Sequence, residues 1–102
     1  MAETSGGTFL FRVSDVVDVP LRGTLLRLRL IEGQPSMRDL GIGRQLRIRD
    51  GDGADREVAI VAHAQTGGRA TQERLDRTRE LDVMVPDGSG PIEIGWLASG
   101  PV

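Results

Sequence analysis

Arginine is the residue type in this sequence with the clearest capacity for chemistry. All 13 basic residues are arginine, and lysine is absent. Arg27 and Arg29 alternate with apolar residues in one stretch, and Arg47 and Arg49 do the same in another. Because successive side chains of a strand point to opposite faces, each pair is expected on the outward face of a strand. On neighbouring strands, the four guanidinium groups would form a ladder that binds phosphate or an acidic partner.

A second interpretation of the same arginines requires no ligand. Exposed arginines on strands commonly form ion pairs with carboxylates, and such pairs contribute little free energy. The carboxylates expected to pair with the four arginines are Asp50, Asp52, Asp55 and Glu57. In addition, the chain has a net charge of −2, whereas a nucleic-acid-binding domain typically has an excess of basic residues.

Other groups with catalytic or metal-binding potential are few. His63 is the only histidine and there is no cysteine, so a disulfide, a thiolate zinc site and a cysteine nucleophile are excluded. The turn at residues 50–55 carries three carboxylates, but Ala54 and Val61 stand where a calcium loop requires oxygen ligands. This turn is therefore interpreted as an Asp-Gly hairpin turn. We predict no catalytic residue, no metal and no cofactor.

Length and composition indicate one small domain. The 102 residues are 38% apolar and 27% charged, which is ordinary for a globular protein. No apolar run approaches the ~20 residues that a membrane-spanning helix needs. The first residues, MAETSGG, lack the basic and apolar regions of a signal peptide. We therefore expect a cytoplasmic protein with no membrane partner.

The pattern of apolar residues predicts an all-β fold. Clusters of glycine and proline separate short alternating stretches. Strands are expected at residues 8–13 (continued by 15–19), 23–31, 44–50, 58–64, 81–85 and 92–96. Such strands fit a small closed six-stranded β-barrel over residues 8–102, preceded by a flexible arm at residues 1–7. The expected core is Leu26, Leu28, Leu30, Leu46, Ile48, Ile60, Val83 and Ile94, with Trp96 packed beside it.

Two connecting segments are less regular than the rest. The loop at residues 34–42 contains Met37 and Leu40 among polar residues. It is expected either to contact a protein partner through these side chains or to fold back as a lid. Residues 66–80 form either an exposed loop or one short helix, in which Glu73 and Arg77 would pair at i, i+4.

The run FRVSDVVDVPLRGTLLRLRLIEG at residues 11–33 resembles the opening of domain 2 of elongation factor Tu and related translational GTPases. The matching positions are Asp15, Val16, Val17, Arg22, Gly23, Thr24 and Gly33. The resemblance implies a stand-alone β-barrel, and it implies that Asp15 and Val17 lie in the region that holds the aminoacylated 3′ end of tRNA. Gly23 and Gly33 would be fold residues, since glycine tolerates close backbone approach and positive φ. No GxxxxGK[ST] motif is present, so nucleotide hydrolysis through a P-loop is excluded.

These observations predict a non-enzymatic binding module. Its expected partner is a protein, docked on Met37, Leu40 and the arginine-bearing strands. The first alternative is binding of RNA or another anion by the arginines, in the manner of tRNA-end recognition. The second alternative is a small enzyme that uses His63 or a pair of carboxylates as acid or base.

Overall fold

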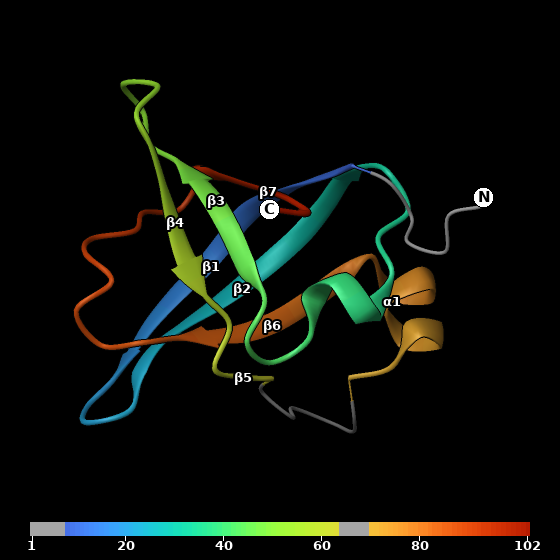
Figure 1. Cartoon of the computed structure of the whole chain (residues 1–102), viewed down its shortest axis with the longest axis horizontal. Helices are drawn as coiled ribbons and strands as arrows, with labels where there is room; N and C mark the ends of the chain where they lie inside the picture. Colours follow the sequence, from blue (N-terminus) through green and yellow to red (C-terminus); the bar gives the residue numbers. More distant parts are fainter. Residues whose placement is uncertain (1–7, 64–69) are drawn as a thin grey trace.

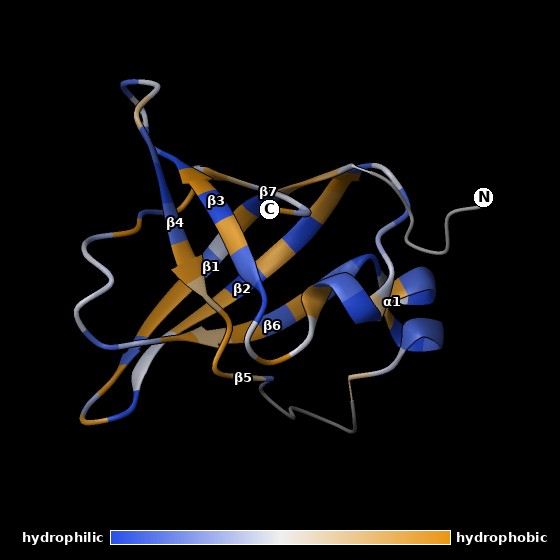
Figure 2. Ribbon diagram, in the orientation of Figure 1, coloured by the Kyte–Doolittle hydropathy of each residue, from blue (hydrophilic) through white to orange (hydrophobic). Residues whose placement is uncertain are grey.

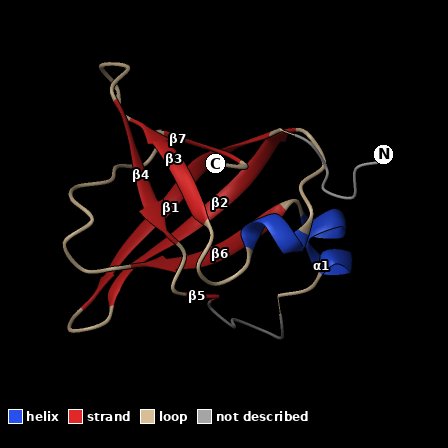
Figure 3. Cartoon of the chain, viewed as in Figure 1, coloured by secondary structure: helices blue, strands red, loops and turns tan. Residues whose placement is uncertain are grey.

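The computed structural model describes residues 8–63 and 70–102, and the arm expected at residues 1–7 lies outside them. The chain is mainly β-structure, as the alternating pattern predicts (Figures 1 and 3). The strands are β1 (Phe9–Val19), β2 (Gly23–Glu32), β3 (Gln45–Arg49), β4 (Asp55–Ala59), β5 (Ala62–His63), β6 (Glu80–Val85) and β7 (Leu97–Gly100). A 3-10 helix, η1 (Met37–Leu40), and an α-helix, α1 (Gln72–Thr78), lie beside one end of the sheet.

The seven strands form one antiparallel sheet in the order β4-β3-β7-β1-β2-β6-β5. The long hairpin of β1 and β2 occupies its middle. A register shift between Val13 and Asp15 marks a bulge in β1, which explains why the alternation of the sequence breaks at Ser14. Strand β1 is nevertheless continuous, as expected from its two alternating halves.

Strands β4 and β5 lie at opposite ends of this order, yet only Ile60 and Val61 separate them along the chain. The Ile60 N–H donates to the Arg44 carbonyl at 2.8 Å, and the Val61 N–H donates to the Met84 carbonyl at 2.9 Å. One segment, residues 55–63, is thus bonded to the region of β3 at its start and to β6 at its end. The strand begins at Asp55, three residues before the expected start at Val58, because the turn at 50–55 is tight.

The core lies on the inward face of the sheet and is aliphatic. Of the expected core, all members but one are buried, including Leu26, Leu28 and Ile60 at 0% exposed. The prediction for Ile94 was wrong, because it is 64% exposed. The last strand is Leu97–Gly100, and residues 92–96 form a turn in which the Trp96 N–H donates to the Glu93 carbonyl at 3.2 Å. The orange stretches in Figure 2 follow the buried alternation along β2 and β3.

The segment between β2 and β3 folds back on the core. Leu40 is 0% exposed, so the expectation that it offers a contact surface was wrong, and the lid interpretation describes its position. Met37 packs against the core and is partly buried. Residues 66–69 lie outside the described part, and the remainder of 66–80 contains α1, anchored by Leu75 at 1% exposed. Glu73 and Arg77 form no ion pair within the residues that the structure describes.

Arg56 has a role that the sequence does not reveal. It lies opposite Ile48 in the β3–β4 register and therefore belongs to the inward face. Its guanidinium donates to the Ser89 carbonyl at 2.9 Å and to the Pro91 carbonyl, and it lies 5.8 Å from the ring centroid of Trp96. These contacts fasten the connection between β6 and β7 to β4.

Gly23 lies where the sequence argument requires a glycine. Its φ is +137°, and a β-carbon would lie 2.1 Å from the Val85 carbonyl oxygen. Gly33 also has a positive φ, +91°. Both observations confirm the expectation that these glycines serve the fold.

We predict that Gly23→Ala lowers the free energy of unfolding by at least about 2 kcal/mol, because strain at φ adds to a clash with backbone that cannot move aside. Gly88→Ala is the matched control, since Gly88 has a φ of +87° and no atom lies within 4 Å of the position that a β-carbon would occupy. Its cost should be about 1 kcal/mol, from φ strain alone. Urea unfolding followed by circular dichroism measures both, and equal costs would contradict the clash.

We predict that Arg56→Met lowers the free energy of unfolding by about 1–3 kcal/mol, because the carbonyls of Ser89 and Pro91 lose a charged donor. The fluorescence emission of Trp96, the single tryptophan, should also change in this variant, because Arg56 lies beside its ring. Arg47→Met on the adjacent strand is the control and should cost less than about 0.5 kcal/mol, since Arg47 is exposed and its nearest carboxylate is 3.7 Å away. Similar effects of the two variants would refute the role of Arg56.

Candidate functional site

The four predicted arginines do not form one ladder on neighbouring strands. Arg27 and Arg29 lie on β2, and Arg47 and Arg49 lie on β3. Strands β1 and β7 stand between β2 and β3 in the sheet. The expectation of adjacent arginine strands was therefore wrong, because chain order does not determine strand order in a sheet with long connections.

Each of the four guanidinium groups has a carboxylate on the next strand. On β2, Arg27 Nε lies 3.0 Å from Asp82 Oδ1 and Arg29 Nη1 lies 3.3 Å from Glu80 Oε2. On β3, Arg47 Nη2 lies 3.7 Å from Glu57 Oε2 and Arg49 Nε lies 2.8 Å from Asp55 Oδ1. The ion-paired interpretation is confirmed, although the partners of the β2 arginines are on β6 and not near the acidic turn.

Two of these pairs are bidentate and shift pKa values. Arg27 also donates from Nη2 to Asp82 Oδ2 at 3.2 Å, and this hydrogen bond with the Asp82 charge raises the pKa of Arg27. Arg49 donates in the same way to both oxygens of Asp55. That hydrogen bond lowers the pKa of Asp55 below its ordinary value of 3.8 and raises the pKa of Arg49.

The outward face of β1, β2, β6 and β5 carries side chains in rows that cross the strands. The strand register places Val17 opposite Leu25, Leu25 opposite Met84, and Met84 opposite Ala62. We call these four residues the apolar row. Val17 is 44% exposed, and the other three are half-buried. Val61, next to Ala62, adds a further apolar side chain that is 41% exposed.

A charged row borders the apolar row. The register aligns Asp15, Arg27 and Asp82 across β1, β2 and β6. Arg27 is bound bidentately to Asp82, while Asp15 is exposed and accepts a hydrogen bond from the Val16 N–H at 2.9 Å. This row holds two carboxylates and one guanidinium, so its formal charge is −1. An apolar surface beside an acidic edge suits a partner with apolar and basic side chains.

Sequence reasoning found Asp15 and Val17 but missed the residues that complete the two rows. They are Leu25, Ala62, Asp82 and Met84. Alternation shows that Leu25 and Met84 point away from the core, yet it does not show that they are neighbours. The register between strands far apart in sequence supplies that information.

The remaining predicted groups have structural partners. His63 Nε2 lies 2.7 Å from the Leu40 carbonyl oxygen and so links β5 to the segment that folds over the core. Asp50 Oδ1 accepts hydrogen bonds from the Asp52 and Ala54 N–H groups, at 2.8 and 3.0 Å, which is the Asp-centred turn expected at 50–55. No cluster of three or more metal-ligating side chains occurs among residues 8–63 and 70–102. Within the same ranges, no helix has the length and apolar character to cross a membrane.

Comparison of the chain with protein-family models, with curated proteins and with solved structures finds no match. The class that the fold and the site define is therefore structural: an antiparallel β-domain whose outer face carries an apolar row beside a charged row.

The Arg49–Asp55 pair gives a prediction of pH dependence. Because the pKa of Asp55 is lowered in the folded state, its contribution to stability is present at neutral pH and is lost as the pH falls through that lowered value. Asp55→Asn should therefore lower the melting temperature at pH 7 and have no effect near pH 2. Asp52→Asn removes a charge from the same turn without breaking an ion pair and serves as the control. An effect of Asp55→Asn that is as large at pH 2 as at pH 7 would contradict this prediction.

Proposed function

We propose that this protein is a non-enzymatic binding module that docks a protein partner on the apolar row. The observation that carries the proposal is the position of Val17, Leu25, Met84 and Ala62 side by side on the outer face of the sheet. The partner presents apolar side chains to the row and a basic side chain to Asp15. Elsewhere on the outer face, Arg27, Arg29, Arg47 and Arg49 are engaged by carboxylates of adjacent strands.

The ion pairs support a protein partner over RNA. Binding to a phosphate backbone requires several cationic groups that are free to replace counterions. Arg12 lies opposite Arg29 and forms no ion pair within the described ranges. On the outer face of the described strands, Arg12 is the one arginine without an ion pair, and one guanidinium falls short of the several phosphate contacts that tight RNA binding needs. RNA binding is therefore kept as the alternative outcome of the test below.

We also propose that the sheet closes as a barrel of the kind found in domain 2 of elongation factor Tu. Support comes from residues 55–63, which bond to β3 and β6 at the two ends of the strand order. Gly23 and Gly33, two of the residues that carry the resemblance, have the backbone conformations that require glycine. In this likeness Asp15 and Val17 belong to the tRNA-end region. In this chain Val17 is a member of the apolar row, and Asp15 lies in the charged row beside it.

The assignment as a non-enzyme is supported by the partners of His63 and of four carboxylates of the sheet. His63, the side chain best suited to acid–base chemistry near neutral pH, lies against the Leu40 carbonyl. The carboxylates of Asp55, Glu57, Glu80 and Asp82 are engaged by arginines.

Val17→Arg tests the proposed docking, because an arginine at this position opposes a basic partner and favours RNA. A protein associate that survives nuclease treatment should lose affinity for Val17→Arg by about tenfold or more, as expected when an apolar contact is replaced by repulsion. Ile42→Arg, at a position 69% exposed and outside the row, is the matched control and should bind like the wild type. Binding is measured by calorimetry with the purified associate.

Two results would contradict this proposal. The first is equal affinity of the associate for the wild type and for Val17→Arg. The second is an association that nuclease abolishes, that weakens steeply with salt and that Val17→Arg strengthens, which would establish the RNA alternative.

A further inference from the structure

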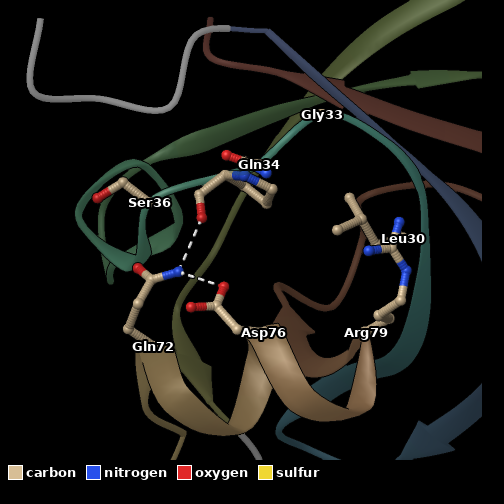
Figure 4. A pocket seen from close by; sticks show the side chains of 8 residues that line it. Leu30, Gly33, Gln34, Ser36, Gln72, Asp76 and Arg79 are labelled. Carbon is tan, nitrogen blue, oxygen red and sulfur yellow. Dashed lines mark hydrogen bonds between the residues drawn. The ribbon is translucent and has the colours of Figure 1, made fainter.

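A hollow lies between α1 and the segment that follows β2 (Figure 4). Its volume is about 440 Å³, which is within the range of sites for small molecules. Its lining includes Leu30, Pro35, Ser36, Gln72, Asp76 and Arg79. None of them belongs to the apolar row, so the hollow is a site separate from the proposed docking face.

The walls of the hollow are held together by one side chain. Gln72 Nε2 donates to the Pro35 carbonyl at 3.1 Å and to Asp76 Oδ1 at 2.9 Å. Gln72 Oε1 accepts from the Met37 N–H at 2.8 Å. The amide thus joins α1 to the facing loop. Walls that are already hydrogen-bonded to each other lose little conformational freedom when a ligand binds, which lowers the free-energy cost of binding.

Two opposite charges face this hollow without neutralising each other. Asp76 accepts a hydrogen bond from Gln72, and neither Asp76 nor Arg79 forms an ion pair within residues 8–63 and 70–102. Figure 4 shows the two side chains on different sides of the hollow. This differs from the sheet, where Arg27, Arg29 and Arg49 each contact a carboxylate.

The position of Arg79 is fixed by its backbone. Its φ of 60° ends α1 in the left-handed region, and its N–H donates to the Leu75 carbonyl at 2.7 Å. Its own carbonyl accepts from the Leu30 N–H at 2.8 Å, which ties the helix end to β2. The guanidinium therefore starts from an anchored point at the rim of the hollow.

We propose that this hollow binds a small zwitterion of the α-amino acid class, with its carboxylate on Arg79 and its ammonium group on Asp76. Asp76 and Arg79 are both exposed at the rim of the hollow, so water screens each charge when no ligand is bound. A ligand with a single charge can pair with only one of them, whereas a zwitterion can form a charged hydrogen bond with each. Leu30 and Pro35, both buried, give the hollow an apolar wall for a short aliphatic side chain.

The test is a titration of the ¹⁵N-labelled full-length protein, followed by amide chemical shifts, with L-alanine as the probe. Acetate and methylammonium, which each carry one of the two charges, are titrated in parallel. L-alanine should shift the amides of Ser36, Gln72 and Arg79 in a saturable manner, with an affinity at least tenfold higher than that of either singly charged probe. Asp76→Asn and Arg79→Gln should each weaken this binding at least tenfold.

Arg77→Gln is the matched control, because Arg77 lies on the same helix and does not line the hollow. It should bind L-alanine like the wild type. Asp76→Asn keeps the acceptor oxygen for Gln72, so it separates loss of charge from loss of fold, and unchanged spectra elsewhere verify this. Absence of saturable shifts from L-alanine, equal affinity for acetate, or equal weakening by Arg77→Gln would each overturn the proposal. None of these results bears on the docking face, whose test uses other residues.

Discussion

The arrangement of this domain depends on one continuous segment, residues 55–63, that hydrogen-bonds to two strands far apart in the sheet order. It pairs with β3 through Asp55–Ala59 and with β6 through Ala62–His63. Backbone hydrogen bonds leave little freedom in register, since a shift by one residue would turn the buried side chains outward. Ile60, at the crossing point, is fully buried. The segment therefore fixes which residues of β5 and β6 stand next to one another on the outer face, including Ala62 and Met84.

Arginine serves different purposes on the two faces of the sheet. The outward-facing arginines of β2 and β3 pair with carboxylates on adjacent strands, where water screens the charges and the ion pairs contribute little to stability. Arg56 faces inward and meets backbone carbonyls and an indole ring. A charged group at that position is retained because carbonyl oxygens of the β6–β7 connection satisfy it. Lysine would supply neither the planar group that stacks on Trp96 nor the fork that reaches two carbonyls.

Those features that depend on local sequence were predictable. The alternation of Leu26, Leu28 and Leu30 indicates a strand with one buried face, and the structure buries all three. Gly23 was identified as a matched position of the resemblance given in the sequence analysis, where glycine is expected because it tolerates close backbone approach. The ion-paired state of the arginines followed from their exposure and from the number of carboxylates in the chain. In each case the residue type and its immediate neighbours indicate the role, although the groups that Gly23 and Arg27 meet, Val85 and Asp82, lie more than fifty residues away.

Features that depend on contacts between distant segments were not predictable. Ile94 alternates with Ile92 and Trp96 as strand residues do, yet Gly95 and the contacts of Arg56 hold that stretch as a turn. The apolar row requires the register of four strands, and no local pattern gives it. The hollow beside α1 requires Gln72 to reach Pro35 and Met37 across more than thirty residues of chain. Asp76 and Arg79 look like ordinary solvated charges until their positions in space are known.

The shortness of β5 has a consequence for how the molecule opens. Strand β2 is paired along most of its length on both sides, whereas β5 contributes only Ala62 and His63 to its ladder with β6. The free energy of a local opening in a native protein is lower where fewer backbone hydrogen bonds must break at the same time. The amide hydrogens near Val61 and Ala62 should therefore exchange with solvent through a local opening of low free energy. Those of Leu26 and Leu28 should exchange only when the whole domain unfolds. One end of the apolar row thus lies on the most easily released strand, and its other members lie on the most persistent ones.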